Sequence, residues 1–379
     1  MIYFDNSATT KPLAEVAELV SNDLQSDDLW GNPGSLHELG TSAYKAYINA
    51  KEDIASCLFV REQELVFTSC ATESANTAIV GFLRRNKRNG RTIISTKTEH
   101  RATLSVLERL SNEGYTVKYI NVDRNGKPDL NELSNAIDGD TSLMCFTHVN
   151  NETGAILPLN EICEIRNQKN RNTALYVDFV QSAGKLKLNL KELNVDLASF
   201  SAHKFHGLKG CGFLYVKNGV KIDPYILGGG QQNGFRSGTE AVYLYRSTAL
   251  ALKRSQEDID EHYEQVSKIN EYLRNELSKR KATILSPEDA LPYVLNVSFD
   301  GFESETMLHC LERYNIYVST ISACSSKTKK ISYVLEAMGV DRKLATNAVR
   351  LSFSRFNTME EAKIFIEKID EIYELFALR

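Results

Sequence analysis

The chain of 379 residues contains only seven prolines, one tryptophan and no long apolar run. No stretch approaches the roughly 20 apolar residues that a membrane-spanning helix needs. The first residues, MIYFDNSATT, lack the cationic and apolar segments of a secretory signal. We therefore expect a cytoplasmic protein. The 45 basic and 49 acidic side chains leave a net charge of −4, so the overall charge favours neither a nucleic-acid nor a membrane partner.

The seven cysteines are odd in number, and no two have C-x-x-C spacing. In a chain of this length, that pattern argues against a disulfide framework and against a metal site of the zinc type. Most of these cysteines are expected to be small buried residues. Cys324 differs because it lies in the polar and basic run Ser322–Lys330, whose lysines favour the nucleophilic thiolate. An incidental exposed thiol is the ordinary alternative.

Short apolar runs alternate with amphipathic stretches between residues 60 and 220. Several runs are almost entirely apolar, as in strands of a parallel sheet that is buried on both faces. The alternation predicts an α/β fold whose open sheet is covered by helices and binds ligands beyond the carboxyl ends of its strands. The expected strands are Glu64–Ser69, Thr92–Thr96, Thr116–Val122, Ser142–Val149, Ala174–Val180, Leu197–Ser201 and Gly212–Val216.

The sequence changes character after Gly238. Residues 241–280 are rich in charge, leucine and alanine and contain neither glycine nor proline, which predicts one or two long helices. Residues 281–379 mix strand-like and helical runs, as in a smaller α+β domain. We therefore expect a large domain over residues 12–252, and a small domain formed by residues 1–11 and 253–379.

Polar residues follow two of the expected strands at the edge where ligands bind. Lys204 comes just after Leu197–Ser201, and a desolvated lysine has a lowered pKa and can bond to an aldehyde. A surface lysine is the alternative. Asp178 lies near the end of Ala174–Val180, where a carboxylate can pair with a protonated pyridine nitrogen. Gln181 could donate to a ring hydroxyl. An aspartate at this position is also a common helix cap.

Three other positions suit a bound anion or a planar ring. Ala71 and Thr72 lie at an expected helix start, where N–H groups and hydroxyls can cradle a phosphate or simply begin the helix. His100 follows a strand and could stack on a ring and move protons, although a lone histidine is more often structural. Arg350 could bind a carboxylate in bidentate fashion or form an internal salt bridge.

The order and spacing of these segments resemble the cysteine desulfurases of the NifS/IscS type, within the class V aminotransferase group of fold-type-I pyridoxal-phosphate enzymes. The matching segments cover nearly the whole chain and are Asp5–Thr10, Gly31–Ser35, Ala71–Ser74, Thr98–His100, His148–Glu152, Asp178 with Gln181, His203–Lys204, Arg236–Thr239, Ser322–Ser325 and Arg350. The resemblance implies a fold-type-I structure with a mostly parallel seven-stranded sheet, a homodimer, and pyridoxal 5'-phosphate as cofactor.

The resemblance also implies residue roles. Lys204 holds the cofactor, His100 stacks on it and moves protons, and Cys324 takes the sulfur of L-cysteine as a persulfide while L-alanine is released. Asn151 and Arg350 bind the substrate carboxylate. The other cofactor contacts are Ala71, Thr72, Asp178, Gln181, Ser201, His203 and, from the second subunit, Thr239.

Four positions beside the strand-end segments depart from the family pattern, and Gln232 and Asn233 replace a charged pair in the glycine-rich loop. Cys70 and Ala202 replace glycine, Leu208 replaces proline, and Phe179 replaces a smaller residue; an added Cβ could tighten or tilt the pocket. The alternative functions are a selenocysteine lyase, a class V aminotransferase and a weakly active sulfur-relay partner. The expected sulfur acceptor is a tRNA-thiolating enzyme or an iron–sulfur scaffold. The short tail after the last expected helix favours the former.

Overall fold

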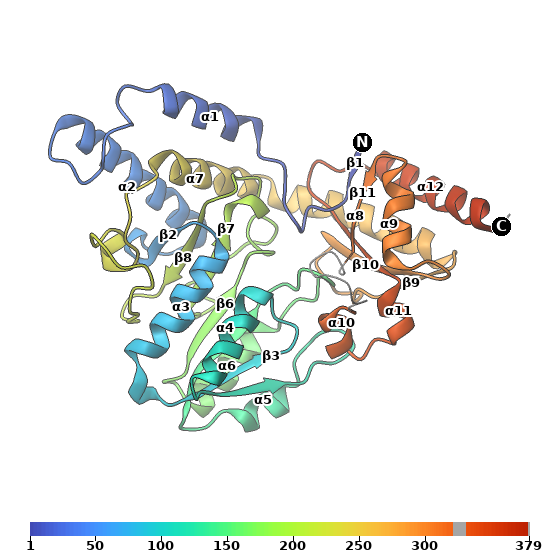
Figure 1. Cartoon of the computed structure of the whole chain (residues 1–379), viewed down its shortest axis with the longest axis horizontal. Coiled ribbons are helices and arrows are strands. Elements are labelled where there is room, and N and C mark those ends of the chain that lie inside the picture. Colours follow the sequence, from blue (N-terminus) through green and yellow to red (C-terminus); the bar gives the residue numbers. More distant parts are fainter. Residues whose placement is uncertain (321–330, 378–379) are drawn as a thin grey trace.

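The computed structural model describes residues 1–320 and 331–377 (Figure 1), so Cys324 lies outside the described residues. Its centre is a seven-stranded sheet in the order β2-β8-β7-β6-β5-β3-β4. The strands are β2 (Leu65–Thr68), β3 (Thr92–Thr96), β4 (Thr116–Ile120), β5 (Thr141–Thr147), β6 (Ala174–Asp178), β7 (Leu197–Ser201) and β8 (Gly212–Val216). Pairing is parallel from β4 to β7, whereas β8 runs antiparallel to β2 and β7. The predicted α/β fold and its mostly parallel sheet are confirmed.

Helices cover both faces of this sheet, because alternate residues of each strand point to opposite faces. On one face, β6 residue Tyr176 packs in a core with α3 (Ala71–Arg85) and α4 (Arg101–Asn112). On the other face, the next residue, Val177, packs in a core with helices from both ends of the sheet. These are α2 (Glu38–Leu58), α5 (Leu130–Ala136), α6 (Leu159–Lys169) and α7 (Val242–Gln256), with α1 (Ala14–Gln25) lying against α7.

A smaller antiparallel sheet has the order β12-β13-β10-β9. Its strands are β9 (Ala282–Ile284), β10 (Val294–Phe299), β12 (Ser319–Thr320) and β13 (Ala348–Ser352). The helices of this part are α8 (Ile259–Ser278), α9 (Ser304–Glu312), α10 (Tyr333–Ala337), α11 (Arg342–Thr346) and α12 (Met359–Ala377). The expected long helices over 241–280 are thus α7 and α8. Short 3-10 turns are η1 (Glu62–Glu64), η2 (Lys87–Asn89), η3 (Ala202–Lys204) and η4 (Gln232–Gly234).

The N-terminal segment runs along the smaller sheet before it reaches the larger one (Figure 1). β1 (Ile2–Tyr3) pairs in parallel with β11 (Ile316–Tyr317), and Phe4 is fully buried in the core of the smaller part. Further along, the N–H of Thr10 donates to the carbonyl oxygen of His203 at 2.9 Å, at the edge of the large sheet. The domain limits given above remain a proposal. No helix in the described ranges is long and apolar enough to cross a membrane.

Candidate active site

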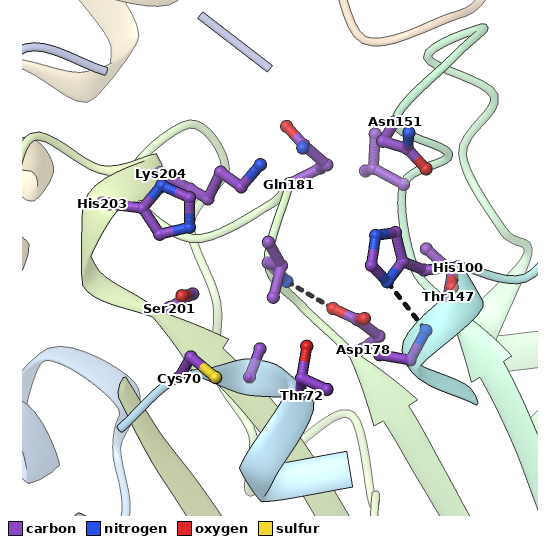
Figure 2. A pocket seen from close by; sticks show the side chains of 14 residues that line it. Cys70, Thr72, His100, Thr147, Asn151, Asp178, Gln181, Ser201, His203 and Lys204 are labelled. Carbon is purple, nitrogen blue, oxygen red and sulfur yellow. Dashed lines mark hydrogen bonds between the residues drawn. The ribbon is translucent and has the colours of Figure 1, made fainter. Parts of the chain in front are cut away.

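A cavity of about 270 Å³ lies beyond the carboxyl ends of β5, β6 and β7 (Figure 2). Strand ends, the turns that follow them and the starts of α3 and α4 all supply parts of its wall. The lining residues are Cys70, Ala71, Thr72, His100, Ala102, Thr147, Val149, Asn151, Asp178, Val180, Gln181, Ser201, His203 and Lys204. The structure therefore brings together all of the expected site residues that it describes, except Thr239 and Arg350.

Lys204 is the lysine of the cavity wall, and η3 carries it there directly after β7. Its Nζ donates to the carbonyl oxygens of Ser7 and Ala8 at 2.5 and 2.8 Å. Burial, together with the charge of Arg350, lowers the pKa of Lys204 to about 8, although the carboxylates of Asp178 and Asp5 oppose the shift. A substantial share of this amine is therefore neutral near physiological pH, the form that attacks an aldehyde.

Asp178 and His100 lie close together across the cavity from Lys204 (Figure 2). Burial raises the pKa of the Asp178 carboxyl, and the positive charges of His100 and Lys204 oppose that shift. Nδ1 of His100 accepts the N–H of Ala102 at 3.1 Å, so the neutral ring carries its proton on Nε2. Burial lowers the pKa of His100, with Asp178 opposing the shift. A buried carboxylate can pair with a protonated nitrogen of an aromatic ring, and a planar imidazole beside it can stack on the same ring.

The start of α3 at Ala71 forms the bottom of the cavity as drawn in Figure 2. The first N–H groups of a helix have no partner within it and favour a negative charge. Thr72 lies at this end, and Ser201 and His203 face it from the other side. Burial, reinforced by the charge of Lys204, lowers the pKa of His203 to about 4, so its imidazole is neutral.

Of the four departures from the family pattern, only Cys70 lines the cavity. Its φ of −177° is extended backbone, which any residue adopts, so glycine is not required there. Phe179 is fully buried and stacks on Phe200 with ring centroids 5.7 Å apart, inside the core of the large sheet. Ala202 is fully buried in the same core, and Leu208 packs against it. These three side chains therefore pack in or against the core, and none of them lines the cavity.

Arg350 of β13 is buried beside the cavity but does not line it. Its Nη2 pairs with Oδ1 of Asp5 at 2.7 Å, and its Nη1 donates to the carbonyl oxygen of Asn151 at 3.1 Å. Nε of Arg350 has no hydrogen-bond partner among the described residues. The internal salt bridge left open by the sequence is thus present.

Thr239 is exposed on the glycine-rich loop and lies outside this cavity. The loop is fastened to α3, because Nε of Arg236 donates to Oε1 of Glu73 at 2.8 Å. Oε2 of Glu73 accepts the N–H of Ser69 at 2.7 Å. This ion pair therefore connects the loop that carries Thr239 with the helix start that carries Thr72.

Two buried ionisable residues near the site were not predicted from the sequence. Glu99 accepts a hydrogen bond from Thr96 at 2.7 Å, and burial raises its pKa to about 7. Lys185 donates to Oε1 of Gln181 at 2.9 Å, and burial lowers its pKa to about 7. The only signal for Lys185 in the sequence is a charged residue in the otherwise small and apolar run Ser182–Leu186.

An amine of lowered pKa, a buried carboxylate facing it and a helix-start anion site together fit pyridoxal 5'-phosphate, through its aldehyde, pyridine nitrogen and phosphate. The α/β architecture and this site define the class of pyridoxal-phosphate enzymes of fold type I.

Comparison with known proteins gives the same class. Residues 2–365 match the family described as aminotransferase class-V. The chain is 40% identical to a NifS/IcsS protein homolog of Lactobacillus delbrueckii subsp. bulgaricus, over 100% of this chain and 98% of that protein. It is 38% identical to cysteine desulfurase IscS of Methanosarcina thermophila, over 98% and 92% of the two chains. A solved NifS-like protein superposes with a TM-score of 0.93 at 40% identity, covering 99% of each chain. The chain belongs to the class-V aminotransferase family, whose enzymes depend on pyridoxal phosphate.

Proposed function

We propose that this chain is a cysteine desulfurase that converts L-cysteine to L-alanine and passes the sulfur to Cys324 as a persulfide. One observation carries the proposal: the Lys204 amine and the buried Asp178 carboxylate line the same cavity from opposite sides. The choice of cysteine as substrate is supported by full-length similarity to proteins named cysteine desulfurase.

Bound pyridoxal phosphate supplies an electron sink for the substrate carbon next to its ring system. Asp178 holds the pyridine nitrogen protonated, Gln181 donates to the ring hydroxyl, and His100 stacks on the ring. Ala71, Thr72, Ser201 and His203 hold the phosphate. These roles rest on the positions of the side chains around the cavity and on the family resemblance.

Lys204 and His100 are the groups that move protons. A lysine with a pKa of about 8 can both take and return a proton near neutral pH, as a general base and acid must. His100 presents Nε2 because its Nδ1 is engaged by the start of α4. Asn151, which lines the cavity, and Arg350, whose Nη1 donates to the carbonyl oxygen of Asn151, are assigned to the substrate carboxylate.

The sulfur step conserves atoms and electrons. The Cys324 thiolate attacks the sulfur of the substrate, so an S–S bond forms while the C–S bond breaks. The C–S electron pair stays with the substrate carbon, which takes up a proton and becomes the methyl group of alanine. Carbon is reduced and sulfur is oxidised, so no external redox partner is needed.

A homodimer is part of the proposal, because Thr239 is exposed and lies outside the cavity of its own chain. In a dimer it would complete the phosphate site of the second subunit. The persulfide then passes to a tRNA-thiolating enzyme or an iron–sulfur scaffold. These acceptors and the cytoplasmic location remain predictions.

The proposal is tested by Lys204→Ala, with the exposed neighbour Lys209→Ala as the matched control. Wild type and the control should bind pyridoxal phosphate with visible absorbance, retain it covalently after borohydride reduction, and form alanine from cysteine. Lys204→Ala should lose all three properties. Covalent retention or alanine formation in Lys204→Ala would contradict the assignment. Amino transfer to keto acids by wild type, without release of sulfur, would favour an aminotransferase.

A further inference from the structure

Lys185 is a buried cation with an unusual set of neighbours. It lies in the turn after β6 and is only 6% exposed. Its Nζ donates to Oε1 of Gln181 at 2.9 Å, and no carboxylate pairs with it among residues 1–320 and 331–377. The charged groups that act on its amine are Lys204 and Arg350, both of its own sign. The positive charge of Lys185 also contributes to lowering the pKa of the nearby His203 and His206 imidazoles.

The contact with Lys185 fixes which way the Gln181 amide points. In the structure the Gln181 amide turns its oxygen toward Lys185, whose amine donates to it, and its NH₂ group away from Lys185. One of the two N–H bonds donates to the carbonyl oxygen of Ser7 at 3.0 Å. The same oxygen accepts from Nζ of Lys204. Gln181 lines the cavity, which leaves its second N–H for a ligand there.

The position of Lys185 is costly for folding. Burial lowers the pKa of its amine to about 7, far from the value of 10.5 that an exposed lysine has. An apolar side chain of similar length would avoid this penalty, as replacements of buried charges often do. A residue that weakens the fold while holding a cavity residue in one orientation is typical of a functional site.

We propose that Lys185 is a positioning residue, which locks the Gln181 amide so that its NH₂ group faces the ring hydroxyl of pyridoxal phosphate. The proposal rests on the proposed function, because it specifies how Gln181 serves that cofactor. Lys185 itself does not line the cavity, so it would act on the cofactor only through Gln181.

The test compares Lys185→Met with Lys187→Met, a matched control whose side chain is 67% exposed two residues away. Lys185→Met should bind pyridoxal phosphate about ten- to a hundredfold more weakly, as expected for loss of a charge-assisted hydrogen bond. The cofactor-free Lys185→Met chain should melt at or above the wild-type temperature. If Lys185 had a purely structural role, Lys185→Met would instead lower the melting temperature and leave the affinity of the folded protein for pyridoxal phosphate unchanged.

A double-mutant cycle separates action through Gln181 from any other route. Gln181→Leu should weaken cofactor binding, and Lys185→Met should add no further loss in that background. Lys185→Gln keeps a donor for Gln181 and should restore most of the affinity. An undiminished effect of Lys185→Met in Gln181→Leu, or failure of both Lys185 variants to fold, would overturn the proposal. Wild type that fails to bind the cofactor would instead refute the proposed function.

Discussion

At the residue scale, the reactivity of Lys204 is set by its surroundings. Because its pKa is lowered to about 8, capture of pyridoxal phosphate by the cofactor-free protein should rise with pH and reach its half-maximal rate near pH 8. The charge of Asp5 raises this pKa, so Asp5→Asn should shift the midpoint to lower pH. Stopped-flow absorbance over a pH series measures the midpoint. The exposed control Asp27→Asn should leave the midpoint unchanged. A midpoint near pH 10.5 in wild type would contradict the lowered pKa of Lys204.

Glu99 gives a second pH-dependent prediction. Its pKa rises from 4.5 in the unfolded chain to about 7 in the folded one, because it is buried. Between these values the folded state holds more protons, so this group makes stability fall as pH rises. Glu99→Gln should remove this pH dependence and raise the free energy of unfolding at pH 7 by about 2–3 kcal/mol relative to wild type. Denaturant unfolding at pH 5 and pH 7 measures it. The exposed Glu108→Gln should keep the wild-type slope, and an unchanged slope in Glu99→Gln would contradict the account.

Sequence reasoning found the residues that follow strands, because strand ends of a parallel sheet meet at one edge. Lys204 and Asp178 were predicted in this way, and both line the cavity. The salt bridge between Arg350 and Asp5 was beyond reach, since its partners are 345 positions apart and no local pattern connects them. Burial of Lys185 was also missed, because a lone charge in an apolar run is usually exposed.

At the element scale, the seven strands of the large sheet were predicted because each is an apolar run several residues long. Some short elements were not. β1 has two residues and β9 has three, too few for any periodicity to be read, whereas β11 lies within the strand-like run expected over Ile316–Ser319. The reversed direction of β8 could not be predicted either, since an apolar run has the same composition in both directions.

The ion pair between Arg236 and Glu73 connects two elements, the glycine-rich loop and the start of α3. The Glu73 side chain is 10% exposed and that of Arg236 is 21% exposed, so removing one charge leaves the other poorly solvated. Glu73→Gln should cost about 2 kcal/mol of unfolding free energy and speed hydrogen exchange in residues 228–239. The matched control is Glu264→Gln, whose pair with Lys268 is 70% and 65% exposed. It should change stability by less than about 1 kcal/mol. Equal effects of the two variants would contradict the link.

At the scale of the whole molecule, the N-terminal segment holds the two parts of the chain together. Asp5 pairs with Arg350 of the small sheet, and the N–H of Ser7 donates to Oγ of Ser352 at 2.8 Å. The carbonyl oxygen of Ser7 then accepts from Lys204. The segment therefore connects the smaller part directly to Lys204.

Exposed apolar side chains suggest a position for the proposed second subunit. Leu24, Trp30, Leu36 and Leu227 are 65%, 71%, 101% and 79% exposed, in segments at the left edge of Figure 1. If the proposed dimer uses this edge, Leu227→Glu should shift it toward monomer in sedimentation velocity. Leu375→Glu, at a side chain 56% exposed on α12, is the control and should remain dimeric. A dimer unaffected by Leu227→Glu would place the interface elsewhere.

The central claim is that the cavity delivers the sulfur of cysteine to Cys324. Its most direct test is to incubate the pyridoxal-phosphate-loaded protein with sulfur-labelled L-cysteine and to map the label by peptide mass spectrometry under non-reducing conditions. We predict one additional sulfur atom on the peptide that contains Cys324, absent in Lys204→Ala and retained in Cys310→Ala. Label on another cysteine, or full alanine production by Cys324→Ala with no protein-bound sulfur in wild type, would contradict the claim.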